Sequence, residues 1–229
     1  MSLIDDYIIG YNPCLLLEKG IPMKTFMIKV AYQLENSYYE RICLEILRQV
    51  SNALGYLHRS NVLHTDIRIE HLILVGNVVK VIDFSNAIAI EHEKREEIFN
   101  EQDNRSPEEY KNMIMTQKTD VWQLGIMAFG MIRKNQINTL ALAQMNQSEL
   151  TQIIKCYTDV YSLYQLGKIV ECALVINPAR RLLPLTISRR IESMNGIVNL
   201  SDFFVVTYTT ADQILISDDK PEHHFVYFV

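Results

Sequence analysis

The sequence predicts a mainly α fold with a minor β component (α+β), and three observations lead to that prediction. Residues 39–58 carry apolar side chains at helical spacing, which indicates a long helix with one buried face. Residues 121–132 are apolar nearly all round, as a helix buried on every side must be. Two apolar runs, 72–74 and 78–82, flank Gly76-Asn77, a turn signal that predicts a short β hairpin.

The other elements are predicted from the segments that follow the hairpin. Residues 91–105 are charged and lack apolar periodicity, so we expect an exposed loop there, with a short helix as the alternative. Residues 150–157 and 161–176 predict two amphipathic helices, the second ended by Asn177-Pro178. Past residue 198 the pattern changes to runs rich in β-branched and aromatic residues. These runs predict a β-rich extension with strands at 203–208, 214–216 and 225–229.

Composition restricts the class of protein. Hydrophobic residues make up 48% and charged residues 21% of the 229 residues, so the chain can bury a core. The net charge of −5 argues against direct binding to nucleic acid. No apolar run is long enough to span a bilayer, and the first residues include Asp5 and Asp6 rather than the basic residues of a signal peptide. The four cysteines are far apart and form no C-x-x-C, which predicts reduced thiols and an intracellular protein, cytoplasmic or nuclear.

The residues on either side of the predicted hairpin carry the chemistry. His64-Thr65-Asp66 precedes it, His71 lies at its start, and Asp83-Phe84-Ser85 follows it. This arrangement resembles the eukaryotic protein kinases, whose catalytic loop H-R-D-x-x-x-x-N and metal-binding D-F-G turn have the same order. The resemblance implies phosphoryl transfer from ATP, which needs a base near the nucleophile and Mg²⁺ across the phosphates.

The resemblance also implies a role for each residue. Asp66 would be the catalytic base, and Asp83 would hold Mg²⁺ through carboxylate oxygens. Arg68 replaces a lysine that steadies the transferred phosphate, and its planar fork differs from a point ammonium. His71 replaces the asparagine that holds the second Mg²⁺, and imidazole suits softer metals, so we expect this metal position to be degenerate.

Three neighbours of these residues have structural rather than chemical expectations. Ser85 replaces the glycine of D-F-G, which removes a conformationally permissive position. His64 is expected to be a packed structural residue, as its counterpart in the family is, and Phe84 is expected to be structural.

Further family landmarks occur in register over residues 13–184. Ser106-Pro107-Glu108 resembles A-P-E, and Asp120 opens a segment that resembles D-V-W-S-L-G. Residues 177–181 resemble D-P-x-x-R. The resemblance implies that Asp120 is structural, and that Glu108 and Arg181 form a partly buried ion pair while Arg180 points to solvent.

Two details narrow the resemblance within the family. His-Thr-Asp in place of H-R-D is similar to the SR-protein kinases and the LAMMER kinases of the CMGC group. Ser85-Asn86-Ala87 is similar to the segment that follows the metal-binding aspartate in SR-protein kinases. The resemblance implies a divergent relative of these Ser/Thr kinases, whose protein substrate would be arginine/serine-rich.

The family's amino-terminal lobe is the part that the sequence does not match. Residues 15–18 resemble the last strand of that lobe and the hinge, and only fourteen residues precede them. We therefore expect a remnant of lobe and hinge at 1–20, a kinase-like carboxy-terminal lobe at 21–197 and a β-rich tail at 198–229. No Gly-x-Gly-x-x-Gly motif occurs in the chain.

The nucleotide side of the cleft can still be assigned by the resemblance. The positions expected to contact the nucleotide are Leu16, Glu18, Ile73 and Ile82. An open cleft would expose apolar surface around Leu16, Ile73 and Ile82, so we expect some cover there, either from the tail or from a second protein.

The sequence leaves two functions open. The first is a catalytically impaired kinase-like domain, a pseudokinase that needs no cofactor and binds a protein partner. The second is an active Ser/Thr kinase that uses ATP and Mg²⁺, with its other lobe absent from this gene model or supplied by another chain. The genomic sequence upstream of Met1 would discriminate between them, because an in-frame Gly-rich loop and lysine would favour the enzyme.

Overall fold

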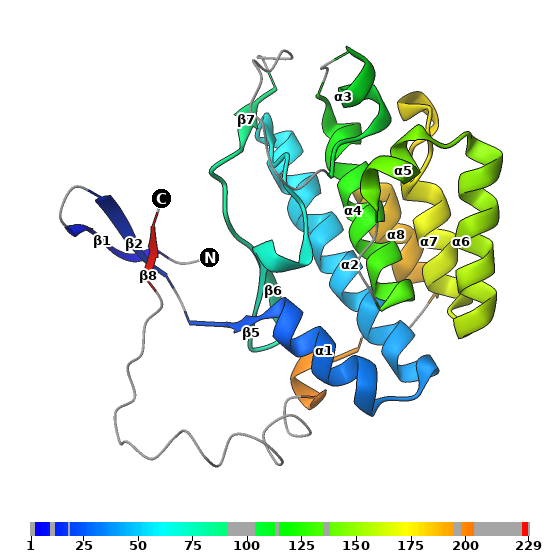
Figure 1. Cartoon of the computed structure of the whole chain (residues 1–229). Helices are drawn as coiled ribbons and strands as arrows, with labels where there is room; N and C mark the ends of the chain where they lie inside the picture. The colour runs from blue at the N-terminus through cyan, green and yellow to red at the C-terminus, as the bar shows by residue number, and fades with distance from the viewer. Residues whose placement is uncertain are drawn as a thin grey trace.

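The computed structural model of the protein describes residues 3–9, 12–17, 19–90, 104–112, 115–134, 138–194, 198–203 and 226–228. Its main body is a bundle of helices with short antiparallel strands along one side (Figure 1). This architecture confirms the predicted mainly α class. The helices are α1 (Met23–Gln33), α2 (Asn36–Arg59), α3 (Pro107–Asn112), α4 (Gln117–Arg133), α5 (Thr139–Gln144), α6 (Gln147–Tyr161), α7 (Tyr164–Ala173) and α8 (Pro184–Met194), with 3-10 turns η1 (Ile69–His71), η2 (Pro178–Arg180) and η3 (Leu200–Phe203).

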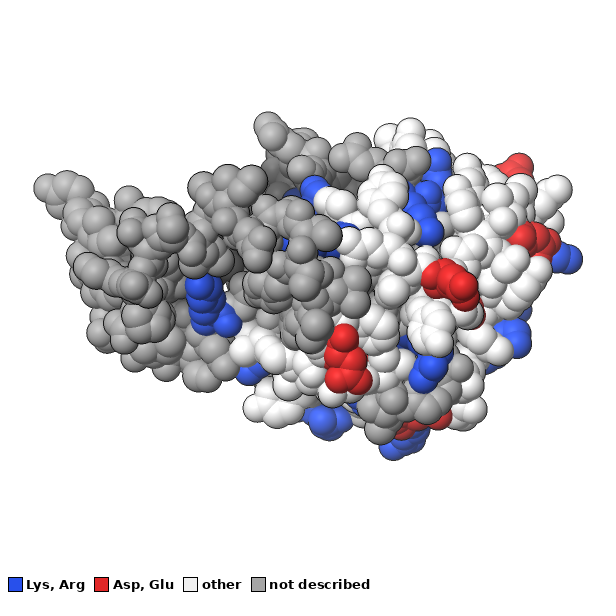
Figure 2. Space-filling model, turned by 90° about the horizontal axis from the view of Figure 1, so that it is seen from below, with Lys and Arg blue, Asp and Glu red and all other residues white. Residues whose placement is uncertain are grey.

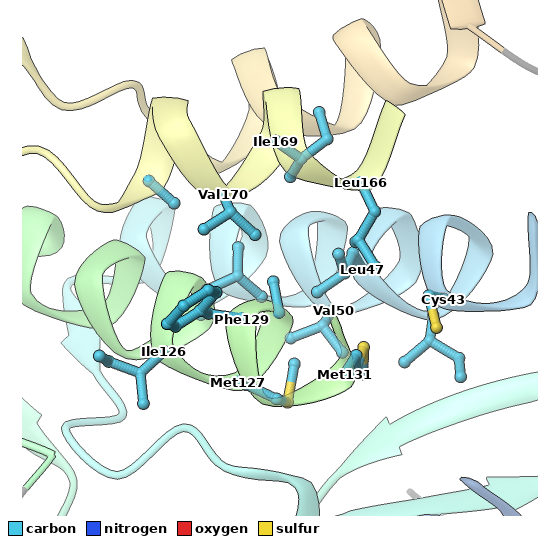
Figure 3. Close-up of a cluster of buried hydrophobic side chains, with 14 of the residues drawn as sticks. Cys43, Leu47, Val50, Ile126, Met127, Phe129, Met131, Leu166, Ile169 and Val170 are labelled. Carbon is cyan, nitrogen blue, oxygen red and sulfur yellow. The ribbon is translucent and has the colours of Figure 1, made fainter. Parts of the chain in front are cut away.

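The bundle core lies between α2, α4 and α7. Ile42, Ile46, Val50 and Leu54 recur every fourth residue along α2 and are fully buried. Figure 3 shows Val50 of α2 among side chains of α4 and α7, such as Phe129 and Val170. Burying each such apolar side chain contributes roughly 1.5–3 kcal/mol, so the core fixes how these helices pack.

Helix α4 is the central element of the bundle. Every residue from Thr119 to Phe129 is buried, which agrees with the predicted helix at 121–132 that is apolar nearly all round. The helix starts earlier than predicted because Thr116 caps it: its side chain accepts a hydrogen bond from the Lys118 N–H, and Thr119 reciprocates. Asp120 and Gln123 are polar residues buried in this helix, and buried polar side chains need hydrogen-bond partners, which both find in the backbone of residues 64–67.

The strands form small antiparallel sheets. β5 (Leu72–Val75) and β6 (Val78–Val81) are the predicted hairpin, and Gly76 in its turn has φ +57, a backbone conformation that glycine adopts without strain. β3 (Ile21–Pro22) adds to β5, and β4 (Val62–Leu63) pairs with β7 (Ile88–Ala89). β1 (Leu3–Ile9), β2 (Asn12–Leu17) and β8 (Val226–Phe228) form a sheet in the order β1-β2-β8, beside the helical body (Figure 1).

Some predicted boundaries are wrong. The predicted helix 161–176 begins at Tyr164, because Ser162 takes a left-handed conformation (φ +55) that ends α6. The predicted strand at 203–208 cannot begin at Phe203, which lies in the 3-10 turn η3. The strand predicted at 225–229 is present as β8. Residues 91–103 of the predicted loop and the strands predicted at 204–208 and 214–216 lie outside the described residues.

Charged side chains are dispersed on the face of the molecule that is seen from below. Seen from below, Lys, Arg, Asp and Glu side chains of the described residues are scattered among neutral surface rather than gathered in a single-sign patch (Figure 2). Among the described helices, none is both long and apolar enough to cross a membrane.

Candidate active site

Two buried polar side chains of α4 hold the loop that contains Asp66. The Asp120 carboxylate accepts hydrogen bonds from the backbone N–H groups of His64 (3.1 Å) and Thr65 (2.8 Å). The Gln123 side chain accepts from the Ile67 N–H (2.9 Å) and donates to the Thr65 carbonyl (2.6 Å). Thr65 has φ +65, and these bonds stabilise that strained conformation. The position of Asp66 is therefore set by the central helix.

His64 joins this loop to the segment after β6. Its Nε2 lies 3.1 Å from the Ile82 carbonyl, and its Nδ1 accepts from the Asp66 N–H at 3.3 Å. These partners require a neutral ring with hydrogen on Nε2. Burial lowers the pKa of His64, although the nearby Asp120 carboxylate acts in the opposite direction. One side of the ring contacts Phe84, with the ring centroids 4.9 Å apart, although Phe84 itself is 46% exposed.

Asp66 faces two basic side chains. It is only 6% exposed, and its Oδ1 lies 3.9 Å from Nε of Arg68. His71 approaches it from η1: Nδ1 is 2.9 Å from the Asp66 carbonyl oxygen and 3.5 Å from Asp66 Oδ2. Asp66, the base expected from the sequence, therefore lies directly beside His71, the residue expected at the degenerate metal position.

The same histidine reaches the second aspartate. Nε2 of His71 lies 3.3 Å from Oδ2 of Asp83, so one imidazole spans the space between the two carboxylates. The other oxygen of Asp83, Oδ1, accepts hydrogen bonds from the Ser85 hydroxyl (2.6 Å) and the Ser85 N–H (3.3 Å). Burial acts to raise the pKa of Asp83, but the Ser85 hydrogen bonds and the nearby His71 and His64 outweigh it, so the pKa is below its usual value.

These contacts do not fit the donor set that Mg²⁺ requires. Mg²⁺ takes oxygen ligands in near-octahedral geometry. Ser85 engages one Asp83 oxygen, and an imidazole nitrogen faces the other where the family has an amide oxygen. Within the described parts of the chain, no three His, Cys, Asp or Glu side chains converge on a point where a metal could bind. His71 and Ser85 thus each contact one carboxylate oxygen of Asp83, whose side chain is 43% exposed.

The four residues expected to contact the nucleotide lie in different surroundings. Leu16 lies in β2, where its backbone pairs with Val226, and Glu18 lies outside the described residues. Ile73 and Ile82 are 3% and 6% exposed, so both are covered, which agrees with the expected cover over these residues. Strand β3 pairs with β5 at Ile73, which the sequence motifs did not reveal.

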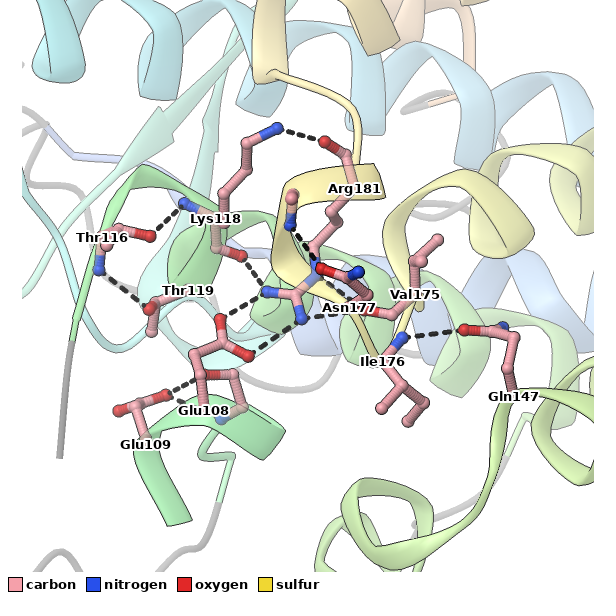
Figure 4. A network of polar contacts seen from close by, with 12 residues as sticks. Glu108, Glu109, Thr116, Lys118, Thr119, Gln147, Val175, Ile176, Asn177 and Arg181 are labelled. Atoms are coloured by element: carbon pink, nitrogen blue, oxygen red, sulfur yellow. Dashed lines mark hydrogen bonds and ion pairs between the residues drawn. The ribbon is translucent and has the colours of Figure 1, made fainter. Parts of the chain in front are cut away.

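The structure contains the predicted ion pair between the end of the activation-segment motif and the late helices. Nη1 and Nη2 of Arg181 lie 2.7 and 3.0 Å from the two carboxylate oxygens of Glu108 (Figure 4). The guanidinium also donates to the Val175 carbonyl from Nε (3.1 Å) and Nη2 (2.8 Å), and it lies over the Trp122 ring. Arg181 is 1% exposed, whereas Arg180 is exposed, as predicted.

Sequence reasoning missed one member of this polar centre. His58 received no role, yet its Nε2 lies 2.7 Å from Oδ2 of Asp120, and its side chain is buried. A signal for its burial was present: His58 follows Val50 and Leu54 at four-residue spacing on the apolar stripe of α2. Its partner could not be found that way, because Asp120 is 62 residues away in the sequence.

Comparison with known proteins agrees with this geometry. The family model described as "Protein kinase domain" matches residues 15–190. The relatives include an Aurora kinase of Saccharomyces cerevisiae, 29% identical over 102 residues (44% of this chain and 28% of the relative), and one of Eremothecium gossypii, 34% identical over 86 residues (37% and 23%). The serine/threonine-protein kinase PLK4 of Drosophila grimshawi is 29% identical over 156 residues (66% of this chain and 20% of the relative).

These matches span between 20% and 28% of each relative's length. The family match, in contrast, covers the described helices from α1 to α7, most of α8 and the loop that carries Asp66. Its members use ATP and Mg²⁺ when they transfer a phosphoryl group. The chain belongs to the protein kinase domain family, with Ser/Thr kinases among its relatives.

Proposed function

We propose that this chain is a kinase-like domain with impaired phosphoryl transfer that acts as a protein-binding module. The single observation that carries the proposal is the position of His71. Its ring lies between Asp66 and Asp83, with Nδ1 3.5 Å from one carboxylate and Nε2 3.3 Å from the other. An imidazole there takes the space in which the family holds Mg²⁺.

The expected loss of activity follows from what the reaction needs. Phosphoryl transfer gives the protein little covalent work, so catalysis depends on positioned cations that stabilise the phosphate charge. Ser85 hydrogen-bonds to Asp83 and further reduces the oxygen donors that remain for a metal. Arg68 keeps a positive charge near Asp66 but cannot reproduce the point ammonium of a lysine.

A melting experiment tests this proposal. A ligand present at 100 times its Kd stabilises the folded state by about 2.7 kcal/mol. In a chain of this size that energy raises Tm by roughly 5–10 °C. We expect no such rise when millimolar ATP·Mg is added to the purified chain. A rise that Asp83→Asn abolishes would refute the proposal.

An active Ser/Thr kinase is the second candidate. The observation in its favour is that Asp66 and Asp83 are brought together around a single histidine ring, although 17 positions separate them, and that Arg68 lies beside Asp66. Radiolabel transfer from the γ-phosphate of ATP to protein, lost in Asp66→Ala, would support it. A variant that restores the family residues, Arg68→Lys with His71→Asn and Ser85→Gly, is the matched comparison.

The proposal also includes the kinase subgroup, the kind of partner and the cellular location. The SR-protein-kinase or LAMMER-like subgroup rests on the His64-Thr65-Asp66 and Ser85-Asn86-Ala87 motifs, whereas the relatives named above are Aurora and PLK4 kinases. The partner or substrate would be a protein, without direct contact to nucleic acid or membrane. An intracellular location, cytoplasmic or nuclear, fits a domain whose family uses ATP.

A further inference from the structure

A cavity of about 700 Å³ lies beside the loop that carries Asp66, between α1, η1 and the second half of α4. Its size falls within the range of ligand-binding clefts. Arg68, which lies beside Asp66, is one of its lining residues, so the cavity is adjacent to the candidate active site. The proposed chemistry does not use this space.

The interior of the cavity is apolar and adaptable. Met27, Met127 and Met131 line it and are 4–7% exposed, so they form walls with little solvent contact. Methionine side chains are unbranched and polarisable, which suits them to contact apolar groups of differing shape. On α1, Ile28 and Tyr32 line the same cavity and are 53% and 85% exposed, which is unusual for such large apolar side chains.

The charged side chains around the cavity are mainly basic. Among the described lining residues the cations are Lys24, Arg68 and Lys134, and Glu70 is the carboxylate. They come from different walls: α1, the loop before η1 and the end of α4. The Lys134 ammonium lies 4.7 Å from the centre of the Tyr39 ring and donates to the Ala31 carbonyl at 3.2 Å, which holds its charge at the cavity.

The acidic member of this set is already paired. Lys24 Nζ lies 3.0 Å from Glu70 Oε1, and this ion pair crosses from α1 to η1. An arginine of a bound segment would have to displace Lys24 from Glu70 and would also face Arg68 and Lys134. A carboxylate would meet complementary charge instead, which favours encounter and correct register.

We propose that this cavity binds a short segment of a partner protein in which a large apolar side chain adjoins acidic residues, and that Lys24 excludes arginine-rich segments. The inference rests on the proposed protein-binding function and names the chemical class of its partner. The apolar side chain enters among the methionines and contacts Tyr32 at the rim, while the acidic residues face the cations. An arginine/serine-rich partner, implied by the subgroup resemblance, is disfavoured.

The test uses the full chain and two fluorescein-labelled peptides of equal length. One has the core Asp-Glu-Phe-Asp-Glu, and the other is an arginine/serine repeat. By fluorescence anisotropy we expect the acidic peptide to bind at least about tenfold more tightly than the repeat, and to lose about tenfold when its phenylalanine is replaced by alanine.

Exposed residues provide variants that should fold normally. Lys24→Glu should weaken the acidic peptide about tenfold and strengthen the repeat. Lys155→Glu, the same charge change at an exposed position on α6, should do neither. Tyr32→Ala should weaken the acidic peptide, whereas Tyr56→Ala, an exposed tyrosine of α2 outside the cavity, should not.

The inference is overturned if neither peptide binds, if the repeat binds as well as the acidic peptide, or if Lys24→Glu and Lys155→Glu behave alike. The proposed function fails on a different measurement, the ATP·Mg melting shift, which uses no peptide. Tight binding of the repeat through this cavity would leave the binding-module proposal standing and refute only the partner chemistry.

Discussion

Replacing Arg181 by alanine should strongly destabilise the folded protein. The side chain is fully buried, and its guanidinium pairs with both oxygens of Glu108 while also donating to the Val175 carbonyl. Removing it leaves the Glu108 carboxylate, whose side chain is 11% exposed, without its counter-charge. Breaking a buried pair by removing one partner typically costs about 3–5 kcal/mol.

The neighbouring arginine is the matched control. Arg180 carries the same charge but is exposed, so Arg180→Ala should change stability by about 0.5 kcal/mol or less. Arg181→Lys retains the charge without the two-pronged geometry, so its effect should be intermediate.

Urea titration gives the measurement. With a slope of about 2 kcal/mol per molar, a loss of 3–5 kcal/mol lowers the unfolding midpoint by roughly 1.5–2.5 M. The midpoint of Arg180→Ala should stay within about 0.25 M of the parent chain. Equal midpoints for the two alanine variants, or a larger shift for Arg180→Ala, would refute the register that pairs Glu108 with Arg181.

Three further predictions test the polar centre, the thiols and the core. Asp120→Asn should cost about 2–4 kcal/mol in urea, because a buried carboxylate that accepts backbone hydrogen bonds is lost; an unchanged midpoint would contradict its role in holding the loop. Burial raises the pKa of the Cys43 thiol to about 12, so iodoacetamide at neutral pH should label the exposed Cys156 well before Cys43, as read by peptide mass spectrometry; faster labelling of Cys43 would disprove its burial. Ile42→Ala should lower stability by about 2–5 kcal/mol and Ile28→Ala by less than about 1 kcal/mol, because the first side chain is fully buried and the second is 53% exposed; similar losses would show that the core is misplaced.

The sequence by itself determined the local elements and the register of the family motifs. The stripe on α2 and the nearly all-apolar α4 are periodic patterns, and a period is a local property of the chain. Gly76 marked the hairpin turn because its left-handed conformation suits glycine. The ion pair of Glu108 with Arg181 was also predicted, but only through the family resemblance, since 73 positions separate the two residues.

Only the tertiary structure decided what the substituted residues do. The sequence marked His71 and Ser85 as departures from the family pattern, but it did not show that one ring spans Asp66 and Asp83 or that Ser85 hydrogen-bonds to Asp83. The Lys24–Glu70 ion pair was equally hidden from sequence reasoning. Such contacts depend on distances of a few ångströms between segments far apart in the chain. Those distances are fixed by how the helices and strands pack, which no local pattern encodes.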